Sequence, residues 1–195
     1  MIKYPVLEIF TSIQGEGTHI GTCATFIRLV GCNLRCSWCD TKLSWDEKIQ
    51  IEMSIKEILL QVKSDFVVIT GGEPCLYDLD PLIQELHSKQ KYVCLETNGT
   101  LPTPREIDWV TCSPKPGVHW EIHEDCRYDE LKYVVDEVFS VEAVHTSAWQ
   151  RKDVEIWLQP EGYNLKQSAK KAFALVMEYP RLRMGIQLHK ILEVK

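Results

Sequence analysis

Short apolar segments recur along the chain, and most of them are followed by polar or glycine-containing residues. Segments rich in β-forming residues, some with alternating apolar and polar positions, predict strands. Apolar residues spaced three and four positions apart predict helices between them. The predicted strands cover residues 6–10, 24–30, 66–69, 92–95, 107–111, 131–135, 154–158 and 182–188.

The first two predicted helices have clear starting signals. Ser54 and Glu57 have the spacing of a capping box, in which each side chain bonds the backbone of the other residue. The apolar face of this helix extends to Val62. The second helix is predicted to be capped by Asp80, with Pro81 in its first turn, where proline is tolerated.

The last two helices differ in how strongly they are specified. Residues 138–149 are predicted to be helical from a weak pattern. Asn164 is predicted to cap a long helix that reaches residue 179 and is stopped by Pro180. Its apolar positions form a broad face, which consists of Leu165, Ala169, Ala172, Phe173, Val176 and Met177.

Alternation of strands and helices favours a mostly parallel α/β fold. Ligands of such folds sit at the carboxyl ends of the strands, where this sequence places its polar motifs. Eight complete βα units need about 250 residues, whereas this chain has 195. The prediction is a single domain, residues 1–195, with an incomplete and modified TIM-type (β/α) barrel.

Composition limits which partners the protein can bind and which cellular compartment it is expected to occupy. The chain is 45% hydrophobic and 26% charged with a net charge of −6, so no basic field favours nucleic acid or an anionic membrane. No apolar run approaches the roughly 18 residues of a membrane span. Eight cysteines without a secretion signal at the start of the chain indicate a reducing cytoplasm.

The segment 31–41 carries the strongest chemical signal, because Cys32, Cys36 and Cys39 lie within eight residues. Three thiols this close cannot all form disulfides with one another, but they can surround one ion or cluster. Three thiolates on a four-iron cube leave one iron open for an exogenous ligand. The alternatives are a zinc site with a remote fourth ligand and plain buried thiols.

Other polar motifs follow the remaining strands. Gly15 and Gly17 permit close approach of a partner to the loop after the first strand. Arg28 is a charged residue within an apolar strand and is suited to bind a carboxylate. The segment 70–74 ends a strand with two glycines and Glu73, whose carboxylate is suited to an ammonium group, although a simple turn explains the same pattern.

Taken in order, these motifs resemble one family along nearly the whole chain. The cysteine triplet resembles the cluster loop of radical S-adenosylmethionine (SAM) enzymes. The complete set resembles the 7-carboxy-7-deazaguanine synthases, radical SAM lyases of 7-deazapurine and queuosine biosynthesis. The segments that carry the resemblance are 8–17, Arg28, 31–41, 70–74, 96–100, 113–115, 130–135, 159–160 and 187–190.

The resemblance implies a [4Fe–4S] cluster on Cys32, Cys36 and Cys39, with SAM bound to its fourth iron. It implies conversion of 6-carboxy-5,6,7,8-tetrahydropterin to 7-carboxy-7-deazaguanine with loss of ammonia and regeneration of SAM. Glu96 and Arg28 are the expected catalytic residues. SAM contacts are expected at Trp38, Cys39, Asp40, Gly72, Glu73, Glu96, Asn98, Ser113, Pro114, Lys115, Gln159, Pro160, Glu161 and Gly162. Substrate contacts are expected at Ile13, Gln14, Gly15, Arg28, Thr70 and Lys195.

The resemblance also implies Mg²⁺ bound at Thr41, a homodimer, and an electron donor such as flavodoxin or ferredoxin. Two other readings of the sequence stay open at this point. One is a different small radical SAM enzyme, such as an activase that forms a glycyl radical on a partner protein. The other is a binding module without catalytic activity, in which the three cysteines hold zinc or a cluster for structural reasons.

Overall fold

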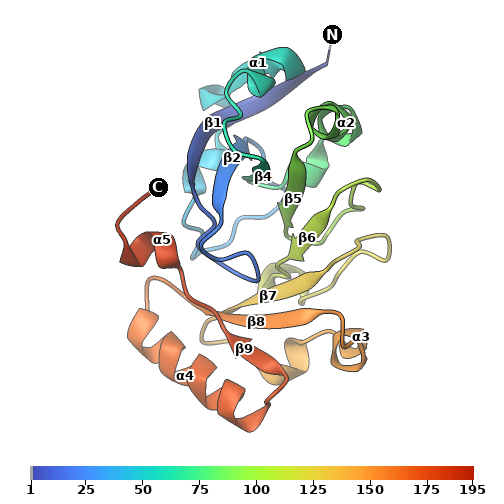
Figure 1. Ribbon diagram of the computed structural model, residues 1–195. Coiled ribbons are helices and arrows are strands. Elements are labelled where there is room, and N and C mark those ends of the chain that lie inside the picture. Colours follow the sequence, from blue (N-terminus) through green and yellow to red (C-terminus); the bar gives the residue numbers. More distant parts are fainter. Residues whose placement is uncertain (1) are drawn as a thin grey trace.

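The computed structural model describes residues 2–195, and these form one nine-stranded sheet with helices on its outer side (Figure 1). The spatial order of the strands is β3-β1-β2-β4-β5-β6-β7-β8-β9. Their bounds are β1 Lys3–Ile13, β2 Cys23–Leu29, β3 Ile51–Ser54, β4 Phe66–Gly71, β5 Tyr92–Thr97, β6 Trp109–Cys112, β7 Glu130–Val135, β8 Glu155–Pro160 and β9 Leu182–Met184.

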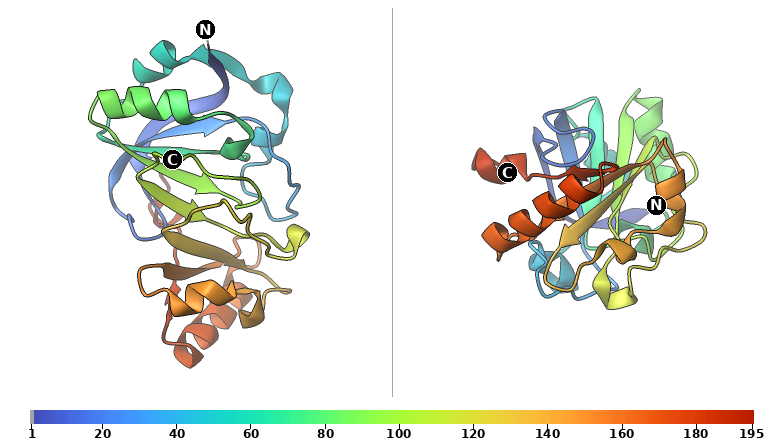
Figure 2. Two further views of the ribbon diagram at one scale, coloured as in Figure 1. Left: turned by 90° about the vertical axis from the view of Figure 1, so that its right-hand side faces the viewer. Right: turned by 90° about the horizontal axis from the view of Figure 1, so that it is seen from below.

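Neighbouring strands from β2 to β9 pair in parallel, whereas β1 is antiparallel to both β2 and β3. The sheet curves but does not close on itself (Figures 1 and 2). The predicted incomplete TIM-type barrel is therefore confirmed. The prediction omitted β3, which adds an antiparallel edge beside β1.

The α-helices are short apart from two. They are α1 Ile55–Leu59, α2 Asp80–Ser88, α3 Thr146–Gln150, α4 Leu165–Glu178 and α5 Leu188–Ile191. Single 3₁₀ turns are η1 Lys42–Trp45, η2 Glu47–Ile49, η3 Pro74–Leu76, η4 Pro116–Val118 and η5 Val141–Ala143. Among residues 2–195, no helix is both long and apolar enough to cross a membrane.

Helix starts agree with the predictions in part. Ser54 and Glu57 form the predicted capping box of α1. Asp80 is the first residue of α2 and not its cap, which is Leu79. Asn164 precedes α4, but its side-chain oxygen accepts no capping bond from the backbone; its Nδ2 donates to Gln167 at 2.9 Å.

Two longer predictions are wrong in detail. The segment 138–149 holds only the 3₁₀ turn η5 and the five-residue helix α3, separated by extended residues. The final strand ends at Met184, and the predicted strand residue Leu188 begins helix α5 instead. Backbone bonding explains this change of direction, since the amide of Leu188 bonds the carbonyl of Gly15 at 2.9 Å.

Alternation along the strands creates two different faces. In β7, Leu131, Tyr133 and Val135 belong to the hydrophobic core between the sheet and its helices. Lys132 and Val134 lie on the inner face and line a cavity. A period of two residues therefore separates core from cavity within one six-residue strand.

Candidate functional site

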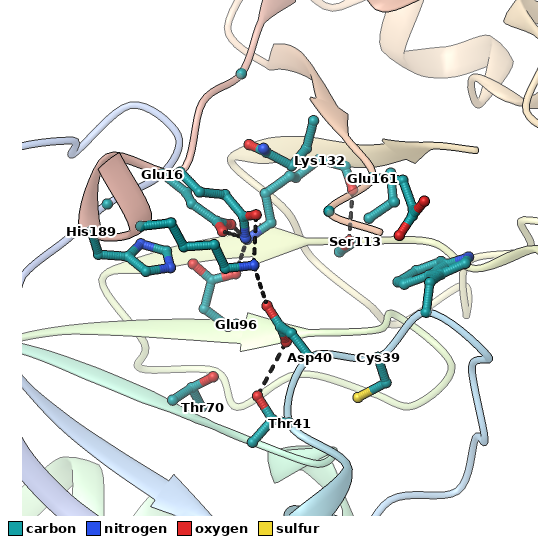
Figure 3. A pocket seen from close by; sticks show the side chains of 18 of the residues that line it. Glu16, Cys39, Asp40, Thr41, Thr70, Glu96, Ser113, Lys132, Glu161 and His189 are labelled. Carbon is teal, nitrogen blue, oxygen red and sulfur yellow. Dashed lines mark hydrogen bonds and ion pairs between the residues drawn. The ribbon is translucent and has the colours of Figure 1, made fainter. Parts of the chain in front are cut away.

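A cavity of about 860 Å³ opens at the carboxyl ends of the parallel strands. This volume lies within the range of about 300–1,000 Å³ that is typical of small-molecule sites. Its walls come from the loop after β2, the ends of β4 to β8, the loop after β1, and the segment that follows β9 (Figure 3). Residues distant in sequence therefore meet where a TIM-type barrel places its active site.

The loop after β2 forms one wall and brings all three predicted cluster cysteines to the cavity. The amide of Cys39 bonds the carbonyl of Cys36 at 3.1 Å, and the amide of Leu34 points at the Sγ of Cys32 at 3.4 Å. All three cysteines are free thiols. Three thiols that line one wall are the ligand type of an iron–sulfur cluster with one iron left open, although in residues 2–195 their side chains do not converge into a ready-formed metal-binding group.

Burial raises the pKa of Cys32 and of Cys36 above their ordinary value of 9.0. A coordinated metal ion deprotonates a thiol outright, so this shift does not oppose ligation. Leu34 and Trp38 also line the cavity beside the thiols. These apolar groups limit the access of water to a cluster at this position.

Backbone contacts with β4 hold the cluster loop in place. The amide of Glu73 bonds the carbonyl of Gly31 at 2.8 Å, and the amide of Gly31 bonds Ser44 at 2.7 Å. A Cβ on Gly72 would lie only 1.9 Å from the oxygen of Gly31. Only glycine permits this approach between the strand end and the loop.

Glu73 and Pro114 are the two predicted SAM contacts that do not line the cavity. The carboxylate of Glu73 is fully buried and accepts bonds from the hydroxyl of Thr97 at 2.8 Å and the amides of Asn98 at 2.7 Å and Cys75 at 3.0 Å. Burial raises its pKa despite these bonds. Glu73 therefore ties β4 to the end of β5, and its contact with the ammonium group of SAM stays a prediction.

The end of β6 supplies a polar wall opposite Trp38. The ammonium of Lys115 donates to the carbonyl of Ser113 at 2.5 Å and to its hydroxyl at 2.6 Å. It also lies 5.6 Å from the centre of the Trp38 ring, and the indole of Trp38 bonds Asp136 at 3.0 Å. Burial lowers the pKa of Lys115.

The turn after β8 lines the cavity with all four predicted residues, 159–162. The carboxylate of Glu161 accepts the amides of Tyr163 at 2.6 Å and Asn164 at 2.9 Å. Its own amide bonds the hydroxyl of Ser168 in α4 at 2.6 Å. Glu161 thus orders the turn that leads into α4, and this fixes the turn beside the cavity.

Arg28 lies at another wall with the predicted Mg²⁺ residue. Its Nε donates to Glu8 at 3.0 Å, and its Nη1 lies 3.4 Å from the hydroxyl of Thr41. Thr41 in turn donates to Asp40 at 3.2 Å (Figure 3). Thr70 is the register partner of Arg28 on β4, so alternation directs both side chains into the cavity.

The loop after β1 and the end of the chain complete the cavity. Ile13, Gln14 and Gly15 line it, and so does Lys195. The ammonium of Lys195 forms an ion pair with Glu8, which also binds Arg28. The predicted substrate contacts from both chain ends therefore reach the same space as Arg28.

A model of the radical SAM superfamily matches residues 26–110. The 7-carboxy-7-deazaguanine synthase of Bacteroides thetaiotaomicron is 42% identical over 199 residues, covering 96% of this chain and 97% of that protein. The synthase of Aquifex aeolicus is 38% identical, covering 96% and 93%. The chain belongs to the 7-carboxy-7-deazaguanine synthase family. The crystal structure of QueE from Escherichia coli agrees, with a TM-score of 0.82 at 30% identity over 96% of this chain and 95% of that one.

Membership in this family means that a [4Fe–4S] cluster and SAM are the cofactors and that the chain is a radical SAM enzyme acting on a small molecule. The expectation of a zinc-binding module is thereby set aside. The individual ligand contacts assigned from the sequence stay predictions, although all except Glu73 and Pro114 line the cavity.

Sequence reasoning missed several polar residues of the cavity. Glu16, Lys132, Gln187, His189 and Lys190 all line it. Each belongs to a segment that carries the family resemblance, 8–17, 130–135 or 187–190. The sequence therefore held a signal for these residues, because each is a polar side chain within a segment that resembles the family.

Proposed function

We propose that the chain converts 6-carboxy-5,6,7,8-tetrahydropterin to 7-carboxy-7-deazaguanine, releasing ammonia and regenerating SAM. The observation that carries this proposal is the single cavity in which three thiols, Arg28 and Glu96 meet. Thiols suit the cluster, and a guanidinium suits the substrate carboxylate. Glu96 offers a hydrogen-bond acceptor for the N–H groups of the pterin.

When held by Cys32, Cys36 and Cys39, the cluster with SAM would supply the radical chemistry for removal of the hydrogen at C6 of the substrate. The chain must hold C6 near that site and exclude other hydrogen donors. Phe10 and Phe26 stack with their ring centres 5.0 Å apart and line the cavity with Val134 and Met184. These apolar side chains keep water away from one face of a bound pterin.

The carboxylate of the substrate is assigned to the wall formed by Arg28 and Thr41. Glu8 holds the Nε of Arg28, which leaves the end of the guanidinium directed toward Thr41. The hydroxyl of Thr41 and the carboxylate of Asp40 are hard oxygen ligands of the kind that Mg²⁺ takes together with water and a substrate carboxylate. We propose Mg²⁺ at this wall, where it would orient the substrate carboxylate.

The test is an anaerobic reaction of reconstituted protein with reductant, SAM, Mg²⁺ and the carboxypterin. Mass spectrometry should detect 7-carboxy-7-deazaguanine in excess over the SAM consumed. Cys36→Ala is the matched control and should yield neither product nor 5′-deoxyadenosine. Formation of 5′-deoxyadenosine without the deazaguanine would refute the substrate assignment and favour another radical SAM activity, such as a glycyl-radical activase.

We also propose that two copies form a homodimer through the outer sides of α4 and α5, which lie toward the same side of the molecule (Figures 1 and 2). Phe173 and Met177 on α4 are 59% and 67% exposed, and Ile191 and Leu192 at α5 are 66% and 54% exposed. Large exposed apolar side chains that join into one patch mark an interaction surface, and these residues on α4 and α5 are the proposed contact. Light scattering should give twice the chain mass, and Phe173→Glu should give the monomer mass.

The electron donor is proposed to be flavodoxin or ferredoxin in the cytoplasm. The cluster loop is half exposed, so a partner protein has access to it: Cys32, Cys36 and Cys39 are all of intermediate exposure. Turnover supported by either reduced protein in place of a chemical reductant would support this assignment. Absence of turnover with either reduced protein, under conditions in which the chemical reductant supports turnover, would contradict it.

A further inference from the structure

Lys132 is a buried ammonium group held between two carboxylates at the wall of the cavity (Figure 3). Its Nζ lies 2.6 Å from Oε2 of Glu16 and 2.7 Å from Oε2 of Glu96, and its side chain is only 11% exposed. The three residues come from the loop after β1, from β5 and from β7. Gln187, in the segment after β9, donates to the other oxygen of Glu16 at 2.6 Å.

The cluster of Lys132, Glu16 and Glu96 is not needed merely to hold the loop after β1 in place. The same loop has a second anchor, since the amide of Thr18 bonds the buried carboxylate of Glu130 at 2.9 Å. A Cβ on Gly17, whose φ is +67°, would lie 2.3 Å from that carboxylate, so the contact is close. Burying an ammonium and two carboxylates carries a large desolvation penalty, and a fold alone is served as well by apolar residues.

The charges of the cluster do not cancel, because two carboxylates share one ammonium. Burial opposes ionisation of Glu16, but attraction to Lys132 and the bonds from Lys132 and Gln187 hold its pKa below the ordinary value. Burial raises the pKa of Glu96, and Lys132 opposes that rise. The neighbouring groups that act on these residues also include Glu130, Asp40 and His189.

Glu96 is also the carboxylate of the pair with spare capacity to accept hydrogen bonds. Its Oε1 receives only a long bond of 3.3 Å from the amide of Gln14, whereas both oxygens of Glu16 receive bonds of 2.6 Å. A carboxylate can accept about four hydrogen bonds in total. Lone pairs of Glu96 are therefore available to a molecule in the cavity.

We propose that Lys132 is a positioning residue that keeps Glu96 as a fixed, ionised acceptor for the N–H groups of the reduced pterin. The inference rests on the proposed function, because that function supplies the N–H donors. Without Lys132, two neighbouring buried carboxylates share one site, which favours protonation of one of them. Glu96 is the one expected to take up the proton, because it keeps only the long bond from Gln14 whereas Glu16 keeps the bond from Gln187. Its capacity to accept from the substrate then falls.

The experiment is a double-mutant cycle of Lys132→Met and Glu96→Gln in the reconstituted holoenzyme, measuring kcat and KM for the carboxypterin. Each single change should lower kcat/KM about 10- to 100-fold, as expected for a hydrogen bond to a charged group. The double variant should be no worse than Glu96→Gln by more than about threefold, because Lys132 acts through Glu96. Iron content and SAM affinity should stay unchanged in all variants.

Lys91→Met is the matched control, since it removes an ammonium that pairs with Asp65 at 2.8 Å at the opposite end of the strands. Its kinetics should equal those of the wild type. Lys132→Gln is a second variant that keeps one N–H donor toward Glu96. It replaces Lys132→Met if that variant does not fold, and it should retain more activity than a methionine.

Three results would overturn the inference. The first is a double variant whose defect equals the product of the two single defects. The second is wild-type kinetics in Lys132→Met or Glu96→Gln, and the third is parallel loss of iron and SAM binding, which indicates a structural role. Failure of the proposed function is distinguishable, because it appears as absence of product from the wild-type enzyme.

Discussion

Gly72→Ala tests whether contact between the end of β4 and the cluster loop is as close as the structure shows. The new Cβ would lie 1.9 Å from the oxygen of Gly31 and 2.8 Å from the Cβ of Cys32. Ordinary C···O contacts begin at about 3.3 Å, so the loop must retreat by about 1.4 Å. That displacement breaks the 2.8 Å bond from the amide of Glu73 to Gly31.

Two effects lower the free energy of unfolding in Gly72→Ala. Overpacking of a close contact costs about 1–3 kcal/mol. Loss of one backbone hydrogen bond adds about 1 kcal/mol. We therefore expect Gly72→Ala to lower the free energy of unfolding of the apoprotein by about 2–4 kcal/mol. Reconstituted protein should also hold less iron, because displacement of the loop moves Cys32.

Urea unfolding of the apoprotein and iron analysis after anaerobic reconstitution measure the two effects. Gly117→Ala is the matched control, since a Cβ there meets no atom within 4 Å. It should leave both quantities at the wild-type value or raise stability slightly, because alanine restricts the unfolded chain. If Gly72→Ala unfolds at the wild-type urea concentration and binds full iron, the argument from this close contact is wrong.

Three further changes test other contacts. Ser168→Ala removes the hydroxyl that bonds the amide of Glu161 at 2.6 Å. The free energy of unfolding should fall by about 1–3 kcal/mol, and SAM titration should show weaker binding. An unchanged free energy of unfolding would contradict this prediction. Glu8→Gln weakens the hold on Arg28, so KM for the carboxypterin should rise several-fold while SAM affinity stays constant. The folded pKa of Glu16 lies below its ordinary 4.5, so its contribution to stability is present above pH 4.5 and is lost as the pH falls through the folded pKa. Acid unfolding of Glu16→Gln should therefore be less steep below pH 4.5, and parallel curves would refute this.

Much of the sheet was predictable because strands that line a barrel carry apolar residues on at least one face. The capping box at Ser54 and the strands after it were found from local signals that hold without tertiary structure. Polar motifs after strands indicated the site correctly, since parallel strands bring their carboxyl ends to one edge. Most of the predicted contacts accordingly line one cavity.

The orientation of a side chain within a motif was less predictable. Glu73 follows a strand and two glycines, as a ligand-binding carboxylate does, yet it is buried and three of its acceptor positions are taken by Thr97, Asn98 and Cys75. Lys132 differs from Glu73, because it lines the cavity although the sequence did not mark it as a site residue. It lies in an apolar strand, where a lysine is expected to face solvent, but the barrel interior places it between Glu16 and Glu96. Both results depend on partners from other strands.

Helix α4 shows why apolar periodicity does not identify the partner of a helix. Its apolar positions form the predicted broad face, yet Ala172 is fully buried while Phe173 and Met177 are exposed. The core contacts Ala172, Leu175 and Val176 on α4, whereas Phe173 and Met177 lie outside that contact and are exposed in the described chain. The exposed side chains on α4 either face solvent or are covered by a second copy of the chain. The mass of Phe173→Glu in solution decides between these two interpretations, because only the second predicts that the variant changes from a dimer to a monomer.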